Sequence, residues 1–197
     1  MALSTPELIK KVLNQRVRET LVDETLMPAA VMVLLYPKNG EYCILLNKRS
    51  ELVEHHKGEI SFPGGARDPQ DRDFLDTALR ETEEEMGIQR GDITVLGQLD
   101  DIVTRSRFGV RVYCGTIPYP YPFVPSAIEI AEVLEVPLPS LYDPANIRVE
   151  TRWNDGEFST VYSYTHEKHV VFGATAKILQ QFLEVLQDEW QKGGITT

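Results

Sequence analysis

The stretch from Gly64 to Ile88 constrains the fold of this chain more than any other, because it joins a glycine pair to a helix that ends in a dense acidic run. Within that run, Glu81, Glu84 and Glu85 are spaced at i, i+3 and i+4. On a helix that advances about 100° per residue, their three carboxylates share one face. Such a group suits a hard cation such as Mg²⁺, whereas the simpler alternative is a solvated acidic surface.

The helix of this stretch is expected to run from about Asp73 to Met86, with Gly87 as a left-handed cap. Arg80 precedes Glu84 by four residues, a spacing at which an ion pair would orient the carboxylate. The glycine turn is expected to place a backbone carbonyl near the acidic face. The buried face should consist of residues on a separate arc of the helix: Phe74, Leu75, Ala78, Leu79, Thr82 and Met86.

Apolar runs before the glycine pair predict a buried hairpin. Residues 29–37 are continuously apolar, Lys38, Asn39 and Gly40 form a turn signal, and residues 41–49 predict the returning strand. A short strand should follow and lead into the glycines. Further strands are expected at residues 93–104, 109–119 and 131–136, followed by a long hairpin over residues 147–173.

Two terminal helices and one loop complete the expected elements. Thr5 is expected to cap a helix that continues to about Arg16, and residues 119–129 are too proline-rich for a central strand. The closing helix should bury Ile178, Leu179, Phe182, Val185, Leu186 and Trp190. This order predicts one α/β domain over residues 1–197, in which a mixed sheet lies between helices.

Charge and composition exclude several classes of function. The formal net charge of -10 disfavours a general binder of nucleic acids or anionic membranes, although a divalent metal would still allow a small phosphorylated substrate. Cys43 and Cys114 lie in apolar runs and are expected to be core residues. The N-terminus lacks the apolar core of a signal peptide, and no apolar run has the length of a membrane span. We therefore expect a cytoplasmic protein.

Residues 65–88 resemble the signature of the Nudix hydrolases, which have a glycine, a glutamate six residues later, and then arginine-glutamate, two glutamates and a glycine. Arg80-Glu81, Glu84-Glu85 and Gly87 match the second half of that signature. Asp71 stands in place of the first glutamate, with one extra residue before Arg80, and Thr82 replaces an aliphatic residue. The resemblance implies a Nudix-type α/β/α sandwich.

A wider resemblance points to the coenzyme A pyrophosphatases of this family. It includes residues 45–65, the TALRE sequence at 77–81, the segment EVLEVPLPSLYDPAN and the segment VVFGATAKIL, and so covers most of residues 45–179. Glu54 departs from this branch, which commonly has a basic residue at that position.

The resemblance implies metal-assisted attack of water on a diphosphate linkage, with Mg²⁺ or Mn²⁺ as the cofactor. With coenzyme A or its thioesters as substrate, the products would be 3',5'-ADP and 4'-phosphopantetheine. The metal would be held by Glu81, Glu84, Glu85 and the carbonyl of Gly65, and Arg80 would orient a carboxylate. The residues implied to bind substrate are Arg49, Phe62, Gly64 and Gly65.

Several alternatives remain open from the sequence. The general base is either a glutamate of the acidic run or a distant acid such as Glu129 or Glu132. The rings of Tyr119, Tyr121 and Phe123 either stack on adenine or pack their loop onto the protein body. ADP-ribose, a dinucleotide or a nucleoside triphosphate is the rival substrate, and a non-catalytic nucleotide-binding regulator is the rival function. A small-molecule nucleotide is the expected partner, and a homodimer is left open.

Overall fold

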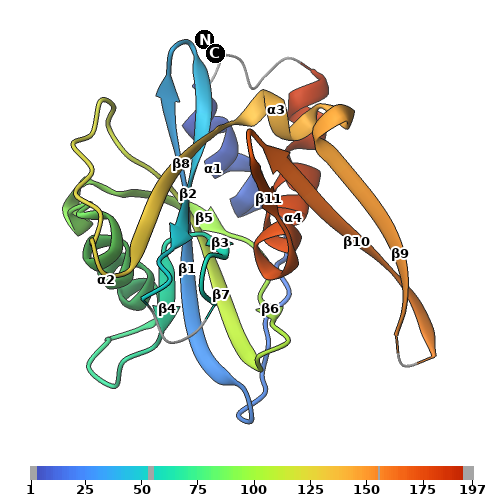
Figure 1. Ribbon diagram of the computed structural model, residues 1–197. Helices are drawn as coiled ribbons and strands as arrows, with labels where there is room; N and C mark the ends of the chain where they lie inside the picture. Colours follow the sequence, from blue (N-terminus) through green and yellow to red (C-terminus); the bar gives the residue numbers. More distant parts are fainter. Residues whose placement is uncertain (1–3, 53–55, 155, 193–197) are drawn as a thin grey trace.

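The computed structural model of the protein describes residues 4–52, 56–154 and 156–192 (Figure 1). These residues form two sheets, and helices cover both sides of the larger sheet. The helices are α1 (Thr5–Gln15), α2 (Phe74–Met86), α3 (Leu138–Tyr142) and α4 (Gly173–Gln191), with single 3-10 turns at η1 (Arg90–Asp92) and η2 (Pro144–Asn146). The strands of the larger sheet are β1 (Met27–Lys38), β2 (Glu41–Arg49), β3 (Ile60–Ser61), β4 (Gly64–Ala66), β5 (Thr94–Gln98), β6 (Ile102–Val103), β7 (Phe108–Thr116) and β8 (Ile130–Pro137). The smaller sheet contains β9 (Ile147–Asn154), β10 (Glu157–His166) and β11 (His169–Val171).

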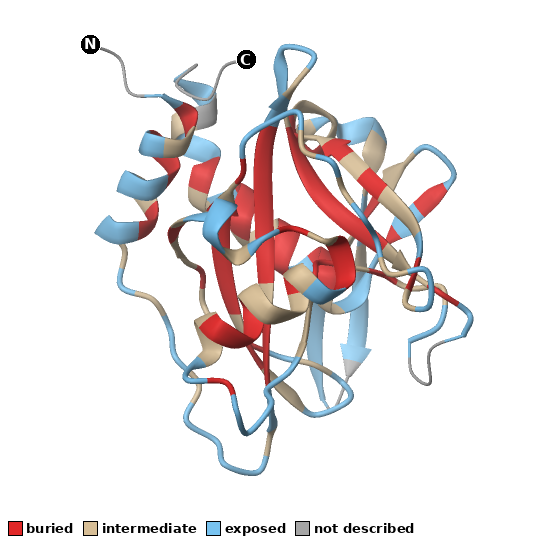
Figure 2. Cartoon of the chain, turned by 90° about the vertical axis from the view of Figure 1, so that its left-hand side faces the viewer, coloured by how far each residue is buried: buried red, intermediate tan, exposed pale blue. Residues whose placement is uncertain are grey.

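Strand β1 is the centre of the larger sheet. It pairs antiparallel with β2 and β4 and parallel with β7, so the sheet is mixed as predicted. Successive β1 side chains enter opposite layers: Val33 and Leu35 pack in the cluster that includes residues of α1 and α4, and Met32 and Leu34 pack in the cluster that includes α2. Because both faces are covered, the strand is apolar up to Lys38 at its end, and buried residues follow the strands through the middle of the molecule (Figure 2).

The first hairpin and helix α2 form where local signals predicted them. Asn39 and Gly40 adopt positive φ angles of 53° and 84° at the turn between β1 and β2. Asp73 caps α2 by accepting a hydrogen bond from the backbone N–H of Asp76, and Gly87 ends the helix with a φ of 69°. On the predicted buried face of α2, Ala78, Thr82 and Met86 are buried, while Phe74, Leu75 and Leu79 are half-buried.

Three expectations about the elements need correction. The N-cap of α1 is Ser4, whose side chain and backbone both bond to Glu7, and not Thr5. The glycines do not form a turn but the short strand β4, which pairs with β1. The strand expected at residues 93–104 divides into β5 and β6, because Asp100 and Asp101 between them bind the backbone N–H groups of Glu19 and Leu21.

The C-terminal half follows the predicted order. Residues 117–129 contain no regular helix or strand, and β9 and β10 form the long hairpin. Helix α4 buries Ile178, Leu179, Phe182 and Leu186, whereas Val185 is half-buried and the side chain of Trp190 lies outside the described part. Cys43 and Cys114 are buried in the core with free thiols. Among the described residues, no helix combines the length and the apolar character needed to cross a membrane.

Candidate active site

The glycine pair of β4 brings the backbone against the acidic face of α2. Gly64 and Gly65 pair with Val31 and Ala30 of β1, and Gly64 has a φ of 153°. A Cβ atom on Gly65 would lie 2.6 Å from the Glu81 carboxyl carbon. A Cβ atom on Gly64 would lie 2.4 Å from the carbonyl oxygen of Ala30. Neither position therefore has room for a side chain. At Gly65, the Glu81 carboxylate fills the space that a Cβ atom would need.

The acidic face of α2 is not a uniformly solvated surface. The side chain of Glu84 is 56% exposed, that of Glu81 is 16% exposed and that of Glu85 is 1% exposed. An acidic face that served only for solubility would keep all its carboxylates in water. The burial of Glu81 and Glu85 therefore favours the site over the alternative of a solvated surface.

Glu85 is held by three donors. The backbone N–H of Gly64 donates to Oε2 at 3.0 Å, Asn47 Nδ2 donates to the same oxygen at 3.1 Å, and Arg49 Nη1 lies 3.1 Å from Oε1. Burial nevertheless raises the pKa of Glu85 to about 7, against the opposing effects of the Gly64 hydrogen bond and of Arg49. Near neutral pH this carboxyl group therefore exchanges between its protonated and ionised forms.

Arg80 organises the other two carboxylates. Its Nη1 lies 2.8 Å from Glu81 Oε1 and 2.9 Å from Glu84 Oε2, as the i to i+4 spacing predicted for Glu84. Asp71 fixes the guanidinium from the opposite side, accepting from Nε at 2.8 Å and from Nη2 at 3.0 Å. This pairing holds the pKa of Asp71 well below its usual range. Asp71, which the sequence analysis set in place of the first glutamate of the signature, thus anchors Arg80.

Glu81 is surrounded by negative charge as well as by Arg80. Burial raises its pKa, Arg80 lowers it, and the nearby carboxylates of Glu84 and Glu129 raise it further. Glu129 reaches this position from the loop before β8, where its carbonyl oxygen accepts a 2.7 Å hydrogen bond from the N–H of Ser50. Of the two distant acids proposed as a base, Glu129 is therefore the one beside the acidic face. Glu132 instead lies 3.1 Å from His169 Nε2.

The other predicted residues have different positions. Arg49 contacts Glu85 and keeps 23% of its side chain exposed, so it lies at the site. Phe62 is 2% exposed and packs in the core, so its side chain offers no surface to a substrate in this structure. Tyr119 stacks on the buried Tyr36 with a centroid separation of 5.4 Å, and Phe123 also contacts Tyr36. These rings pack the loop onto the body, which was one of the two alternatives. Glu54 lies outside the described residues.

Two features of the site were missed from the sequence. Asn47 is fully buried and binds Glu85, and the signal for it was an amide in the middle of the apolar strand β2. The loop before β8 is joined to the last turn of α2 by two main-chain bonds: Val124 N–H to the carbonyl of Met86 at 3.0 Å, and Ser126 N–H to the carbonyl of Glu85 at 2.9 Å. No local pattern indicates such bonds between distant segments.

The donor set has the carboxylate chemistry that a divalent hard cation requires. In the described part of the chain, no three carboxylate, imidazole or thiolate side chains are gathered closely enough to hold a metal as they stand. As they stand, Arg80 pairs with Glu81 and Glu84, while Arg49 pairs with Glu85. Burial is the main cause of the raised pKa values of Glu81 and Glu85, and repulsion from neighbouring carboxylates adds to it. A cation such as Mg²⁺ takes carboxylate oxygens as ligands and would relieve this repulsion.

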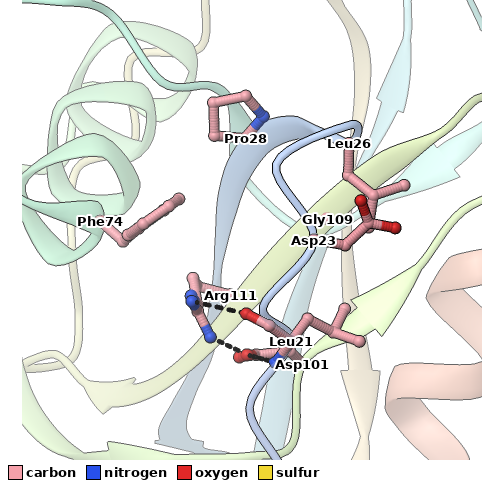
Figure 3. A pocket seen from close by; sticks show the side chains of 8 residues that line it. All are labelled: Leu21, Asp23, Leu26, Pro28, Phe74, Asp101, Gly109 and Arg111. Carbon is pink, nitrogen blue, oxygen red and sulfur yellow. Dashed lines mark hydrogen bonds and ion pairs between the residues drawn. The ribbon is translucent and has the colours of Figure 1, made fainter.

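A small cavity of about 70 Å³ lies elsewhere, and none of the predicted site residues lines it (Figure 3). Its wall includes Phe74 at the start of α2, together with Arg111 and Asp101. Arg111 donates to Asp101 and, at 3.2 Å, to the carbonyl oxygen of Leu21. These bonds fasten the segment before β1 to the sheet, so the cavity belongs to the packing of that segment and not to the acidic cluster.

Comparisons with known proteins agree with this geometry. The family described as NUDIX domain matches residues 26–126. A protein of Photorhabdus laumondii named "Uncharacterized Nudix hydrolase NudL" is 33% identical over 144 residues, which cover 73% of this chain and 77% of that protein. The protein of the same name from Yersinia enterocolitica is 34% identical over 160 residues, covering 79% and 80% of the two chains.

A solved structure shares the fold. The MutT/nudix family protein from Enterococcus faecalis aligns over 95% of this chain and 76% of that protein, with a TM-score of 0.55 and 17% identity. At that identity the likeness concerns the fold alone. The family match and the two relatives, with the acidic helix and glycine strand described above, show that the chain belongs to the Nudix hydrolase family.

Proposed function

We propose that this protein hydrolyses the diphosphate linkage of coenzyme A or its thioesters with the help of Mg²⁺ or Mn²⁺, giving 3',5'-ADP and 4'-phosphopantetheine. The observation that carries the proposed chemistry is the graded burial of Glu81, Glu84 and Glu85 against the glycine strand. The choice of substrate rests on residues 45–65 and on the segments after the acidic helix, which resemble the coenzyme A pyrophosphatases. ADP-ribose, a dinucleotide or a nucleoside triphosphate is the rival substrate.

The metal would be held by Glu81, Glu84 and Glu85, with the carbonyl of Gly65 as a further oxygen ligand. When bound, a divalent cation neutralises the charge on the diphosphate and lowers the pKa of water near the phosphorus. Arg80 keeps Glu81 and Glu84 on the same side of the helix, and Asp71 keeps Arg80 in position through its bidentate contact. The chain thus supplies a preformed acidic face and a support behind it.

Arg49 and Gly64 are the groups best placed to meet the substrate. The guanidinium of Arg49 is partly exposed beside Glu85, and it can turn to a phosphate oxygen when Glu85 binds a cation. The backbone at Gly64 and Gly65 can approach the substrate closely because neither residue carries a side chain. We propose that Phe62 acts indirectly, by packing under this backbone, since its ring is buried.

The proton of the attacking water has two candidate acceptors. Glu85 is one candidate, although a bound cation would hold its carboxylate ionised and its oxygens already accept several hydrogen bonds. Glu129 stands close enough to Glu81 to raise its pKa, on a loop that reaches the acidic face from outside the helix. Glu129→Gln should therefore lower turnover without lowering metal affinity if Glu129 is the base.

A substrate panel with purified protein tests the function. Coenzyme A, acetyl coenzyme A, ADP-ribose, a dinucleoside polyphosphate and a nucleoside triphosphate are each incubated with Mg²⁺ or Mn²⁺, and products are separated by chromatography. We expect the fastest release of 3',5'-ADP from the coenzyme A compounds. Turnover of another substrate alone would reject coenzyme A but retain the hydrolase. Nucleotide binding without any turnover would support the regulator instead.

Glu84→Gln should reduce turnover by at least about 100-fold, because an amide is a much poorer ligand for a hard cation than a carboxylate. The matched control is Glu83→Gln, on the same helix, where the side chain pairs with Arg90 at 2.9 Å. That variant should keep wild-type turnover. Equal activity in both variants would place the metal elsewhere.

Glu54→Arg tests the choice of coenzyme A directly. If a basic residue at this position contacts a substrate phosphate, kcat/KM for coenzyme A should rise relative to that for ADP-ribose. Glu51→Arg provides the control, since Glu51 lies in an exposed turn nearby. An equal change with both substrates, or in both variants, would show only a general effect of charge.

A further inference from the structure

Strand β9 forms one edge of the smaller sheet, and several of its side chains are exposed. Its strands run in the order β11, β10, β9, and the hairpin of β9 and β10 extends away from the body of the molecule (Figure 1). Among the described residues, β9 pairs with β10 on one side and with no strand on the other. A row of backbone N–H and C=O groups along one side of β9 is therefore available for pairing.

This edge lacks three of the devices that commonly protect edge strands, namely proline, lysine and β-bulges. It does carry other charged side chains, at Arg148, Glu150 and Arg152. The sequence of β9, IRVETRWN, contains neither proline nor lysine, and its register with β10 continues without a shift. The larger sheet differs, because the register of β2 with β8 shifts at Lys48/Arg49 and that of β5 with β7 shifts at Val95/Gly97.

Large apolar side chains stand on one face of the same hairpin. Val149 is 54% exposed, Trp153 is 61% exposed and Phe158 is 74% exposed. Trp153 and Phe158 are directly opposite each other and their rings pack edge to face at 4.6 Å. On the other face, the charges alternate as Arg148, Glu150 and Arg152, and Glu150 pairs with each arginine of its own strand at 2.9 Å. The strand thus carries an apolar row and a charged row, and both contribute to the choice of partner.

We propose that two copies of this chain associate through their β9 strands about a two-fold axis at Thr151, forming one continuous sheet with three strands from each copy. In this antiparallel register, Glu150 of each copy lies opposite Arg152 of the other, and Val149 lies opposite Trp153. The apolar row then continues from Phe158 and Trp153 of one copy to Val149 of the second. Both faces of the strand are matched in the same register.

Other registers match less well. With the axis at Glu150, that residue would face its own copy and Arg148 would face Arg152, which places like charges opposite one another. With the axis at Val149, the strands overlap less and Trp153 has no partner. The strand also differs from the acidic surface of the rest of the chain: two arginines and one glutamate give β9 a net charge of +1, whereas the whole chain has a net charge of -10.

The test is a charge exchange read by analytical ultracentrifugation of the full chain, at concentrations from about 1 to about 100 µM, the range suited to a small interface. Wild-type protein should show a concentration-dependent dimer. In a dimer of Glu150→Arg, the new arginine of each copy faces Arg152 of the other copy. In a dimer of Arg152→Glu, the new glutamate of each copy faces Glu150 of the other copy. Each variant alone should weaken the dimer by about tenfold or more.

Mixing the two variants should restore the dimer, because every opposed pair then consists of one arginine and one glutamate. Lys11→Glu is the matched control, since it reverses one charge on the exposed side of α1, away from the smaller sheet. It should leave the dimer within about twofold of wild type. Hydrolysis by each single variant, measured at a concentration where all are monomeric, confirms that the variants fold.

Three results would overturn the proposal: a wild-type monomer at every concentration, a dimer that both single variants retain, or single variants that dissociate without recovery on mixing. The last would show that the strand matters but not in this register.

Discussion

The Glu85 carboxyl is buried between α2 and the strands of the sheet, and its pKa is raised to about 7 mainly by that burial. Glu85→Gln should therefore stabilise the metal-free protein at alkaline pH, even though it removes a proposed metal ligand. Glutamine keeps an oxygen that can accept the hydrogen bonds of the Gly64 N–H and Asn47, and it removes the buried charge. Arg49 loses its partner but remains partly in water.

The size and sign of the effect follow from the pKa. The folded value of about 7 exceeds the ordinary value of 4.5, so the folded protein binds this proton more tightly than the unfolded chain does. The stability that Glu85 contributes is present below about pH 4.5 and is lost as the pH rises through about 7. A difference of about 2.5 pKa units corresponds to about 3 kcal/mol, most of which should be lost between about pH 5 and about pH 8.

The assay is urea unfolding of wild-type protein and Glu85→Gln in the presence of a chelator, at about pH 5 and about pH 8. The free energy of unfolding of the variant, relative to wild type, should rise by about 2 to 3 kcal/mol between the two values. Glu84→Gln is the control, because Glu84 is 56% exposed and should show little change. Added Mg²⁺ should stabilise wild type but not Glu85→Gln.

Two outcomes would refute this reasoning. If Glu85→Gln is less stable than wild type at pH 8 without metal, the contacts with Arg49 outweigh the cost of burial. If the difference between the two proteins does not change with pH, Glu85 does not titrate in the range derived from its surroundings.

Two further predictions concern the support of the acidic face. Gly65→Ala should lower Mg²⁺ affinity, measured by isothermal titration calorimetry, by at least about tenfold, because its Cβ would displace the Glu81 carboxylate; Gly91→Ala, where a Cβ meets nothing within 4 Å, is the control. Asp71→Asn should destabilise the protein by about 3 kcal/mol in urea unfolding and reduce kcat, because it breaks a largely buried pair and leaves Arg80 without its anchor. Unchanged stability would show that the carbonyl of Ala66, Glu81 and Glu84 suffice to position Arg80.

Elements with local signals were predictable from the sequence, and this includes the helix of the site. Asn39 and Gly40 specify their hairpin, and Asp73 and Gly87 mark the two ends of α2. Because Glu84 lies one turn from Arg80, their contact also follows from helical spacing alone. For these residues, the structure needs only neighbours close in the chain.

Features that depend on strand pairing were not predictable in this way. Asn47 reaches Glu85 because β2 pairs with β1, the strand against which α2 packs. Glu129 influences the pKa of Glu81 because its loop is bonded to the last turn of α2. The burial of Phe62 is likewise decided by which layer β3 and the following residues enter. The sequence alone gives the side-chain chemistry of Asn47, Glu129 and Phe62, but it does not give the distant segments that surround them.

The two main-chain bonds between the loop before β8 and the last turn of α2 have a consequence for how this protein can evolve. Neither bond uses a side chain, so any residue type with a backbone N–H, that is any except proline, can stand at positions 124 and 126 without loosening the helix. Val124 and Ile128 of the same loop are 70% and 69% exposed. Substitutions there can therefore change this exposed surface while the acidic helix keeps its place. If the loop contacts the proposed substrate, selectivity and chemistry are free to diverge at different rates.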